Sequence, residues 1–271
     1  MAIVTSPVVN MYANPNLFSE TVSQAKMGDD VKILEDTGQS FFLVKNLWDG
    51  YTGYVEKKCV DPGLTDWNPD PEVVTASLAN LVYTGAKVQS PLLTRLPLGI
   101  RLKLLNTQGA GIPDGWLRVE IPNDQTGFIQ KGDTCTPEEF QFREISALRQ
   151  SLVRWAKKFE GAVPYLWGGT SSFGIDCSGF VQHIYKLHGL PLERDANQIG
   201  QGKYLIDIQR EDVLPGDLIF FEGYGHVGLA ISHYEFIHAT TYSKPVVQVS
   251  EIDCPIWRDR IIQYSRYRLE K

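Results

Sequence analysis

Cys177 is the residue of this chain best placed to act as a nucleophile. It follows Asp176, a good helix N-cap, and the apolar residues after it recur at helical spacing, so Cys177 is predicted in the first turn of a helix. Thiolate is the nucleophilic form of cysteine, and the unpaired N–H groups and dipole of a helix N-terminus stabilise an anion. This position therefore predicts a thiol whose pKa is lower than usual.

His226 and His238 are the candidates for the base that this thiol needs. Short apolar runs with tight connections surround both residues, which predicts neighbouring strands of an antiparallel sheet. In strand alternation His226 shares a face with Gly228 and Ala230, whose small size leaves room for a partner to approach. A protonated His226 would lower the pKa of the thiol further, and His238 could orient the ring of His226. The arrangement predicts an activated thiol for covalent catalysis.

Purely structural roles are the competing interpretation, because a helical cysteine is most often a small core residue. The approach to Cys177 argues against it, since glycines are concentrated between Trp167 and Gly179 and indicate a special backbone. The other cysteines and histidines lack such surroundings. We expect His233 in a solvated turn and interpret the remainder as structural, namely Cys59, Cys135, Cys254, His183 and His188. No spacing among them indicates a disulfide framework or a zinc site.

The elements that must position these residues form a domain predicted over 137–271. Apolar residues from Leu148 to Phe159 recur on one face of a helix, a second helix starts at Cys177, and short strands follow from Asp217 onward. Helices followed by a run of short strands predict an α+β fold with an antiparallel sheet.

Two related units precede this domain. Thr52–Val55 in the first corresponds to Thr126–Ile129 in the second, and Met27-Gly28 corresponds to Leu98-Gly99. The β-branched and aromatic runs of each unit, separated by turn residues, predict small antiparallel barrels. The predicted boundaries are 1–62 for the first barrel, 63–76 for a linker and 77–136 for the second barrel.

Composition restricts the function further. The chain has 271 residues, of which 43% are hydrophobic, too many for intrinsic disorder. Its formal net charge of -6 provides no basic field for a nucleic-acid partner. No apolar run is long enough for a membrane span, and the first residues have neither a basic start nor an apolar signal core. We therefore expect a cytoplasmic monomer, with export by another route as the alternative.

Five motifs in family order resemble the NlpC-type family of cell-wall cysteine peptidases, over roughly residues 145–270. They are YLWGGT at Tyr165–Thr170, DCSGF at Asp176–Phe180, PGDL at Pro215–Leu218, GHVG at Gly225–Gly228 and IHA at Ile237–Ala239. The N-terminal repeats resemble bacterial SH3-like domains. Two such domains before a catalytic domain are similar to the subgroup of γ-D-glutamyl-L-diamino acid endopeptidases, which cut murein (peptidoglycan) stem peptides.

This resemblance implies two SH3-like barrels followed by a papain-like α+β catalytic domain. It implies Cys177 as the nucleophile, His226 as the base and His238 as the third polar residue. It also implies that Tyr165 helps to hold the oxyanion. The implied reaction is hydrolysis of the amide that joins γ-D-glutamate to a diamino acid, with neither a metal nor an organic cofactor.

The resemblance implies substrate-binding residues as well. Asp176 and Ser178 flank the nucleophile and are placed to bind the D-glutamyl portion, and the pair Arg194-Asp195 matches residues that line the pocket. Glu20 and Tyr51 are the candidates for contacts from the first SH3-like domain, against the alternative of a solvated loop charge and an edge aromatic.

An acidic subsite formed by Glu20, Tyr51 and Asp195 would suit a free ammonium group, as on an N-terminal L-Ala. We therefore expect released stem peptides as substrates in preference to intact murein. Two other functions stay open from the residues alone. One is a catalytically inactive wall-binding protein, and the other is an amidase or acyltransferase on the same scaffold.

Overall fold

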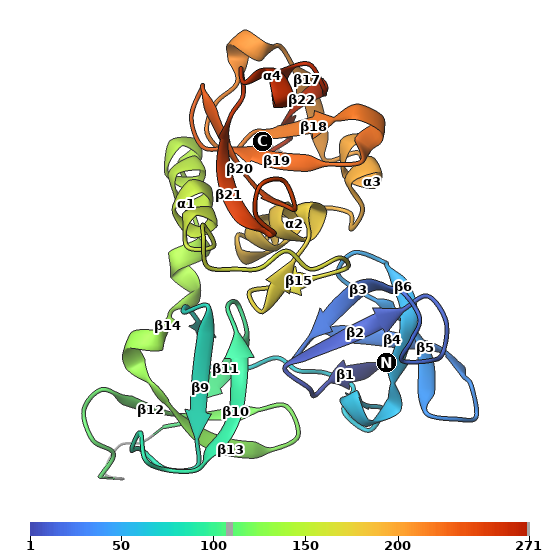
Figure 1. Cartoon of the computed structure of the whole chain (residues 1–271). Coiled ribbons are helices and arrows are strands. Elements are labelled where there is room, and N and C mark those ends of the chain that lie inside the picture. Colours follow the sequence, from blue (N-terminus) through green and yellow to red (C-terminus); the bar gives the residue numbers. More distant parts are fainter. Residues whose placement is uncertain (107–110, 270–271) are drawn as a thin grey trace. The chain divides into compact units, whose positions relative to one another are not determined.

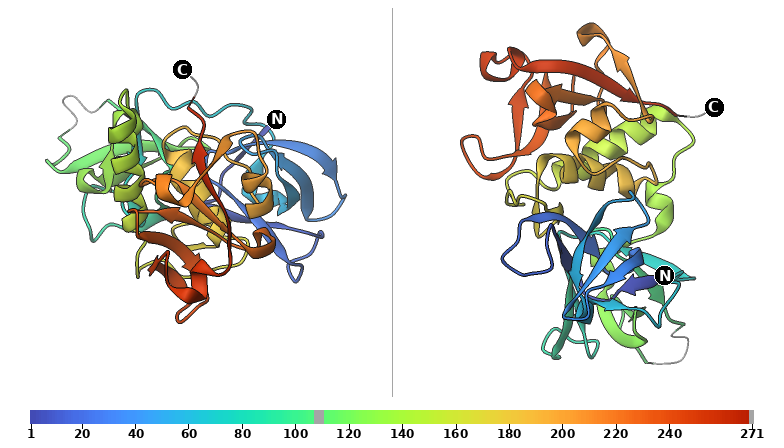
Figure 2. Two further views of the ribbon diagram at one scale, coloured as in Figure 1. Left: turned by 90° about the horizontal axis from the view of Figure 1, so that it is seen from above. Right: turned by 90° about the vertical axis from the view of Figure 1, so that its right-hand side faces the viewer.

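The computed structural model describes residues 1–106 and 111–269 and divides into two compact units (Figure 1, Figure 2). The first unit comprises Met1–Glu139 together with Ser171–Phe173. The second comprises Phe140–Thr170 together with the chain from Gly174 onward. Both sequence repeats therefore lie in the first unit, and the cysteine and histidines of the candidate site lie in the second.

The first unit begins with a seven-stranded antiparallel sheet in the order β3-β2-β6-β5-β4-β1-β7. Its strands are β1 (Ala2–Val4), β2 (Val8–Tyr12), β3 (Thr21–Lys26), β4 (Asp30–Asp36), β5 (Phe41–Asn46), β6 (Thr52–Glu56) and β7 (Val60–Asp61). A short 3-10 helix, η1 (Lys57–Cys59), leads into β7. Apolar side chains that alternate along these strands point inward and form a buried core with Val9, Met11, Val44 and Val55 at its centre.

A second seven-stranded antiparallel sheet has the order β10-β9-β13-β12-β11-β8-β14, which is the order of the first sheet moved on by seven strands. Its strands are β8 (Glu72–Thr75), β9 (Ala79–Tyr83), β10 (Leu92–Pro97), β11 (Arg101–Leu104), β12 (Trp116–Ile121), β13 (Gln125–Gln130) and β14 (Thr134–Cys135). The 3-10 helix η2 (Lys131–Asp133) precedes β14, as η1 precedes β7.

The equivalent turns of the two sheets also match. Gly28 and Gly99, paired in the sequence repeat, have φ angles of 84° and 89°. Only glycine adopts this left-handed region without strain, so the repeated Met-Gly and Leu-Gly steps reflect a repeated turn. Met27 and Leu98 just before them are both buried. The sequence repeat therefore corresponds to a repeat of topology and of turn geometry.

The second unit contains a six-stranded antiparallel sheet in the order β17-β22-β18-β19-β20-β21. Its strands are β17 (Leu205–Ile208), β18 (Leu218–Phe221), β19 (Val227–Ala230), β20 (Glu235–Thr240), β21 (Val246–Glu251) and β22 (Ile261–Tyr267). Three 3-10 helices connect elements, η3 (Pro137–Phe140), η4 (Arg210–Asp212) and η5 (Glu222–Tyr224). The predicted α+β fold with an antiparallel sheet is confirmed.

Four α-helices accompany this sheet, α1 (Ile145–Lys157), α2 (Cys177–Leu187), α3 (Ala196–Gly200) and α4 (Pro255–Arg258). Helix α2 packs against β19 and β20, and α1 packs against α2 (Figure 1). The apolar face predicted for α1 is buried at Leu152, Trp155 and Ala156. The amphipathic pattern therefore placed this helix correctly, with bounds that differ from the prediction by a few residues.

A two-stranded hairpin, β15 (Thr170–Ser171) and β16 (Gly174–Ile175), leads into α2. Its turn, Ser171–Phe173, belongs to the first unit. There the Ser172 hydroxyl donates to the carbonyl of Leu78 at 2.5 Å and accepts from the N–H of Leu98 at 3.0 Å. Three residues of the domain predicted over 137–271 therefore belong to the first unit, which corrects that boundary.

Candidate active site

Cys177 is the first residue of α2, as predicted, and its side chain is buried. Asp176 caps the helix, because its Oδ1 accepts the backbone N–H of Gly179 at 2.7 Å. Its Oδ2 accepts the N–H of Gly168 at 3.0 Å. One carboxylate therefore fixes both the start of the helix and the glycine-rich loop before it.

The glycines near Cys177 permit backbone to pack directly on backbone. A Cβ atom at Gly179 would lie 2.1 Å from the carbonyl oxygen of Gly169, and one at Gly169 would lie 2.4 Å from the carbonyl oxygen of Gly174. Neither contact could be relieved by moving a flexible side chain. The special backbone predicted from the glycine content is present at the start of α2.

His226 and His238 are hydrogen-bonded to each other. Nε2 of His226 lies 2.6 Å from Nδ1 of His238, and Nε2 of His238 lies 3.1 Å from Oγ of Ser250. His226 immediately precedes β19, His238 is in β20 and Ser250 is in β21. Gly228 provides space for this pair, since a Cβ there would lie 2.5 Å from the ring of Phe236 and 3.4 Å from Cβ of His238.

Trp257 of α4 packs against both imidazole rings. Its ring is near-parallel to His226, with centroids 5.8 Å apart, and nearly perpendicular to His238 at 4.7 Å. Trp257 and Ser250, which both follow β20 in the chain, were not among the predicted site residues. The only local signal for Trp257 was the proline at the first position of its helix, Pro255, which favours a helix start.

Burial sets the protonation state of the cysteine and the histidine. It raises the pKa of the Cys177 thiol to about 12, with the Asp176 charge acting in the same direction, while the N–H groups of Val227 and Ser178 act against it. Burial also lowers the pKa of His226 to about 4, against the opposing effect of Asp176. The resting pair is a neutral thiol and a neutral imidazole.

This outcome reverses the predicted direction of the thiol pKa. The predicted lower pKa rested on the helix N-terminus and a protonated His226, both of which stabilise a thiolate. The loss of water around Cys177 is the largest effect on that thiol in the structure, and it disfavours the thiolate. Desolvation also disfavours the imidazolium form of His226, so the second stabilising charge is missing as well.

Tyr165 lies close enough for its phenol to be influenced by Cys177 and Asp176. Its side chain is half-buried, and burial raises its pKa to about 12, with the neighbouring Cys177 and Asp176 acting in the same direction. The phenol therefore keeps its proton over the physiological range and remains a hydrogen-bond donor. The backbone N–H of Tyr165 donates to the carbonyl of Pro245 at 2.9 Å, which anchors the residue beside β21.

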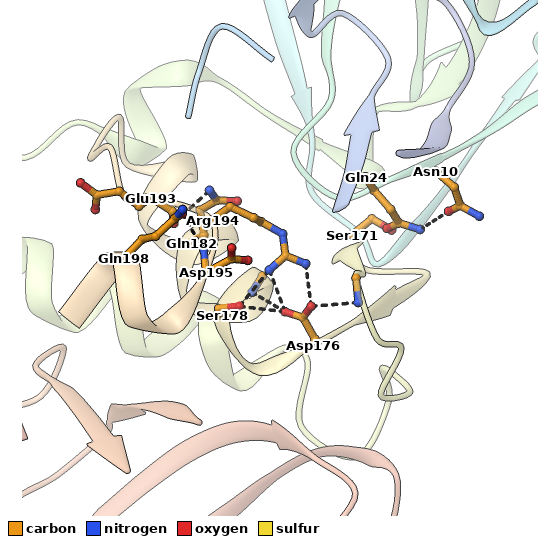
Figure 3. A network of polar contacts seen from close by, with 12 residues as sticks. Asn10, Gln24, Ser171, Asp176, Ser178, Gln182, Glu193, Arg194, Asp195 and Gln198 are labelled. Atoms are coloured by element: carbon orange, nitrogen blue, oxygen red, sulfur yellow. Dashed lines mark hydrogen bonds and ion pairs between the residues drawn. The ribbon is translucent and has the colours of Figure 1, made fainter. Parts of the chain in front are cut away.

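Arg194 is fully enclosed and makes a two-pronged ion pair with Asp176 (Figure 3). Nη2 lies 2.6 Å from Oδ2 of Asp176, and Nη1 lies 3.2 Å from Oδ1. Nη1 also donates to the Ser178 hydroxyl at 2.8 Å. Asp195, the next residue, caps α3 through a capping box with Gln198. The structure thus brings together the predicted residues Asp176, Ser178 and Arg194.

Glu20 and Tyr51 belong to the first unit. Glu20 is exposed just before β3, and its carbonyl accepts the N–H of Ala13 at 2.9 Å. Tyr51 is half-buried just before β6, and its carbonyl accepts the N–H of Asn46 at 2.8 Å. Their predicted subsite with Asp195 of the second unit stays a prediction.

The other histidines have packing partners. His188 is buried between Ser151, whose Oγ is 2.9 Å from Nε2, and the carbonyl of Ile184, 2.8 Å from Nδ1, so its structural role is confirmed. His183 is buried with its ring against Phe159, which agrees with its structural assignment. His233 lies in the turn where it was expected, between β19 and β20, but it is half-buried, with its ring between Arg210 and the carbonyl of Val213.

The four cysteines are free thiols, with Cys59 and Cys177 buried and Cys135 and Cys254 half-buried. Within residues 1–106 and 111–269, no group of three or more His, Cys, Asp or Glu side chains is arranged to hold a metal ion. Over the same ranges, no helix has both the length and the apolar character needed to cross a membrane.

Comparison with protein families gives two matches. The NlpC/P60 family matches residues 162–266, which include Cys177, His226 and His238. The bacterial SH3 domain family matches residues 7–61, which cover most of the first β-sheet. The resemblance described from the sequence motifs is confirmed for the NlpC/P60 family and, for the bacterial SH3 domain, in the first of the two repeats.

Individual relatives match along most of their length. Dipeptidyl-peptidase 6 of Lysinibacillus sphaericus is 30% identical over 244 residues, covering 88% of this chain and 87% of the relative. A γ-D-glutamyl-L-lysine dipeptidyl-peptidase of Bacillus cereus is 28% identical over 270 residues, covering 90% of this chain and 74% of the relative.

A solved structure has the same fold throughout. The crystal structure of an NlpC/P60 family protein from Bacillus cereus superposes with a TM-score of 0.81 and covers 98% of this chain and 99% of its own, at 21% identity. The N-terminal β-rich region, the α+β domain with its buried Cys177 and histidine pair, and the full-length relatives together establish that this chain belongs to the NlpC/P60 family.

Proposed function

We propose that the chain is a cysteine peptidase that hydrolyses the amide bond between γ-D-glutamate and a diamino acid in peptidoglycan stem peptides. The observation that carries the proposal is the buried Cys177 thiol at the start of α2 together with the hydrogen-bonded pair His226 and His238. The choice of bond is supported by the names of relatives, among them the γ-D-glutamyl-L-lysine dipeptidyl-peptidases of Bacillus cereus and Bacillus subtilis.

The proposed reaction begins from the neutral pair. Because Nε2 of His226 is engaged by His238, Nδ1 is the ring nitrogen that takes the thiol proton. As the proton moves from Sγ to His226, the sulfur attacks the amide carbon and the carbonyl oxygen acquires negative charge. The backbone N–H of Cys177 and the phenol of Tyr165 are the donors proposed for that oxyanion.

The second half of the reaction returns the enzyme to its starting state. The imidazolium of His226 gives its proton to the leaving amine, the C–N bond breaks, and the acyl group remains on Cys177 as a thioester. Water, deprotonated by His226, then attacks the thioester and releases the γ-D-glutamyl carboxylate and the free thiol. Burial of His226 favours proton donation to the amine, because it disfavours the imidazolium.

Arg194, Asp176 and Ser178 are proposed to bind the D-glutamyl portion as a unit. The Asp176 carboxylate already accepts from Gly168, Gly179 and Arg194, so its main contribution is to hold the arginine and the helix start. The Ser178 hydroxyl donates to Oδ1 of Asp176 at 3.2 Å in the site without substrate. On substrate binding this hydroxyl would turn to the α-carboxylate of D-glutamate, with the positive charge of the buried Arg194 behind it. The Asp195 carboxylate belongs to the acidic subsite proposed next.

We further propose that Glu20, Tyr51 and Asp195 form an acidic subsite for the free ammonium of an N-terminal L-Ala. The first SH3-like barrel, proposed at 1–62, would supply Glu20 and Tyr51, and the catalytic domain would supply Asp195. The second barrel was predicted over 77–136 after a linker at 63–76, but β8 (Glu72–Thr75) already pairs within the second sheet, so the linker ends before Glu72. Equal topology of the two sheets supports treating the second as SH3-like. Released peptides are the proposed substrates, which fits a recycling role in the cytoplasm.

The test uses L-Ala-γ-D-Glu-L-Lys with a free and with an acetylated N-terminus. We expect mass spectrometry to show L-Ala-γ-D-Glu and lysine from the free peptide, and a much lower kcat/KM for the acetylated one. Cleavage at any other bond, or transfer of the acyl group to an added amine in place of water, would contradict the proposed reaction. Equal rates on the two peptides would contradict only the acidic subsite.

A further inference from the structure

The hydrogen-bonded pair of histidines continues to a third side chain, Ser250. Its Oγ lies 3.1 Å from Nε2 of His238, and the side chain of His238 has no exposed surface. We propose that Ser250 is a positioning residue that selects the tautomer of His238 and, through it, the protonation pattern of His226. This inference rests on the proposed function, because it assigns His226 the role of base.

The sheet register explains how Ser250 reaches His238. In the pairing of β20 with β21, His238 lies opposite Gln248, and Phe236 lies opposite Ser250. Residues two apart on a strand point to the same face, so Ser250 is the diagonal neighbour of His238 on that face. The ring of His238 bridges that diagonal to reach the serine hydroxyl.

Two arrangements of protons satisfy this chain of contacts. In the first, Nε2–H of His226 donates to Nδ1 of His238, and Nε2–H of His238 donates to the hydroxyl of Ser250. In the second, the hydroxyl donates to Nε2 of His238, whose Nδ1–H donates to Nε2 of His226. A neutral imidazole carries one N–H, so each arrangement fixes the tautomer of both rings at once.

Only the first arrangement leaves His226 able to accept the thiol proton. There Nδ1 of His226 carries a lone pair, whereas in the second arrangement Nδ1 carries the proton and cannot act as a base. The imidazolium of His226 needs the first arrangement too, since its Nε2–H must donate to an unprotonated Nδ1 of His238. The proton on His238 then has to be on Nε2, where Ser250 is its acceptor.

Burial makes this acceptor important. His238 is fully enclosed, and burial together with the neighbouring His226 lowers its pKa well below 6.5, so it stays neutral. An N–H in such surroundings without an acceptor is costly, more so than a lone pair without a donor. Without the hydroxyl, the pair would shift toward the second arrangement, in which His226 is no longer a base.

The test compares Ser250→Ala with Ser250→Thr, which keeps a hydroxyl at the same position. For Ser250→Ala we expect kcat on L-Ala-γ-D-Glu-L-Lys to fall about tenfold with KM unchanged, the loss produced by one hydrogen bond missing from the transition state. The acidic limb of the kcat profile should also move to lower pH, because the imidazolium of His226 loses its support. Ser250→Thr, which keeps a hydroxyl, should have the kcat and the acidic limb of the unmodified protein.

Ser265→Ala is the matched control. Ser265 is a buried serine of the same sheet, in β22, whose hydroxyl bonds Asp207 and which has no bond to either histidine. We expect this variant to leave kcat and the pH profile unchanged. If kcat fell as far in Ser265→Ala as in Ser250→Ala, both losses would be due to general weakening of the sheet, and the proposal would be overturned.

Nitrogen-15 NMR of the histidine rings reads the tautomer without any activity measurement. In the unmodified protein we expect His238 protonated at Nε2, and in Ser250→Ala a shift toward the Nδ1–H form. Wild-type protein with His238 protonated at Nδ1 would overturn the proposal even if Ser250→Ala did not fold. If the peptide is not cleaved at all, the proposed function fails, while the NMR measurement still decides the role of Ser250.

Discussion

At the scale of single residues, the site is a neutral acid and a neutral base, with Cys177 buried and His226 half-buried. Burial raises the pKa of Cys177 to about 12 and lowers that of His226 to about 4. The thiol proton is thus transferred to His226 only when substrate is bound, as the sulfur attacks the amide carbon. Above about pH 4, His226 is unprotonated and can accept the proton of the thiol.

The pH dependence of catalysis follows from this. The pKa of His226 is about 4, below its ordinary 6.5, so the base is available above pH 4 and is lost as the pH falls through that value. We expect kcat/KM for a stem tripeptide to rise through a limb near pH 4 and to be level between pH 5.5 and 7.5. A limb centred near 6.5 would show that His226 is solvated in the working enzyme.

Substitution of the three reacting or orienting side chains separates their roles. We expect Cys177→Ala to abolish hydrolysis and His226→Ala to reduce it nearly as far, because each removes a group that exchanges the proton. His238→Ala should cost less, since His238 orients the base without taking the proton itself. The measurement is kcat/KM alongside circular dichroism, and hydrolysis by Cys177→Ala above the uncatalysed rate would refute the assignment.

At the scale of elements, the start of α2 is positioned by the absence of side chains. An alanine in a helix is ordinarily more stable than a glycine by about 0.5–1 kcal/mol. At Gly179 the added Cβ would lie 2.1 Å from the Gly169 carbonyl oxygen, so the helix and the loop would have to separate. We expect Gly179→Ala to lower both the melting temperature and kcat.

Gly132→Ala is the control for this prediction. Gly132 lies in η2, and a Cβ there would meet no atom within 4 Å. This variant should melt and react like the unmodified protein. If Gly179→Ala also kept full activity and stability, the close approach of the two backbones would have no role in positioning Cys177.

The sequence was informative where the signal was local. The Asp176 cap, the glycines around Cys177 and the small residue at Gly228 all lie within a few positions of the residues that they serve, and the structure has each as predicted. Ser250 and Trp257 were missed, because their approach to the histidines depends on strand register and on the return of the chain after β21. The sign of the thiol pKa was wrong for the same reason, since burial is a property of the assembled fold.

At the scale of the whole molecule, histidines with lowered pKa values make the free energy of unfolding depend on pH. Burial lowers the pKa of His188 from 6.5 to about 4, so the folded chain binds fewer protons than the unfolded chain between those values. His226 and His238 have pKa values shifted in the same direction. Stability is therefore fully present above pH 6.5 and decreases as the pH falls toward 4.

We expect the urea midpoint of unfolding to decrease between pH 7 and pH 4. His188 alone would account for up to about 3 kcal/mol of that loss, from 1.36 kcal/mol per pKa unit. In His188→Gln, which cannot titrate, the midpoint at pH 7 should be lower and its dependence on pH weaker. The same slope in both proteins would mean that His188 is protonated in the folded state without cost.

Strand β21 has a consequence for how this site can vary. On one edge it pairs with β20, which carries His238, and on the other the segment with Val163 and Tyr165 bonds to its Pro245–Val247 end. The distance between Tyr165, the proposed oxyanion donor, and the histidine pair is therefore set by the one segment from Pro245 to Ser250. Substitutions along β21 would leave the length of this connection unchanged. A single residue inserted or deleted between Pro245 and Ser250 would shift the backbone that anchors Tyr165 relative to the serine that contacts His238.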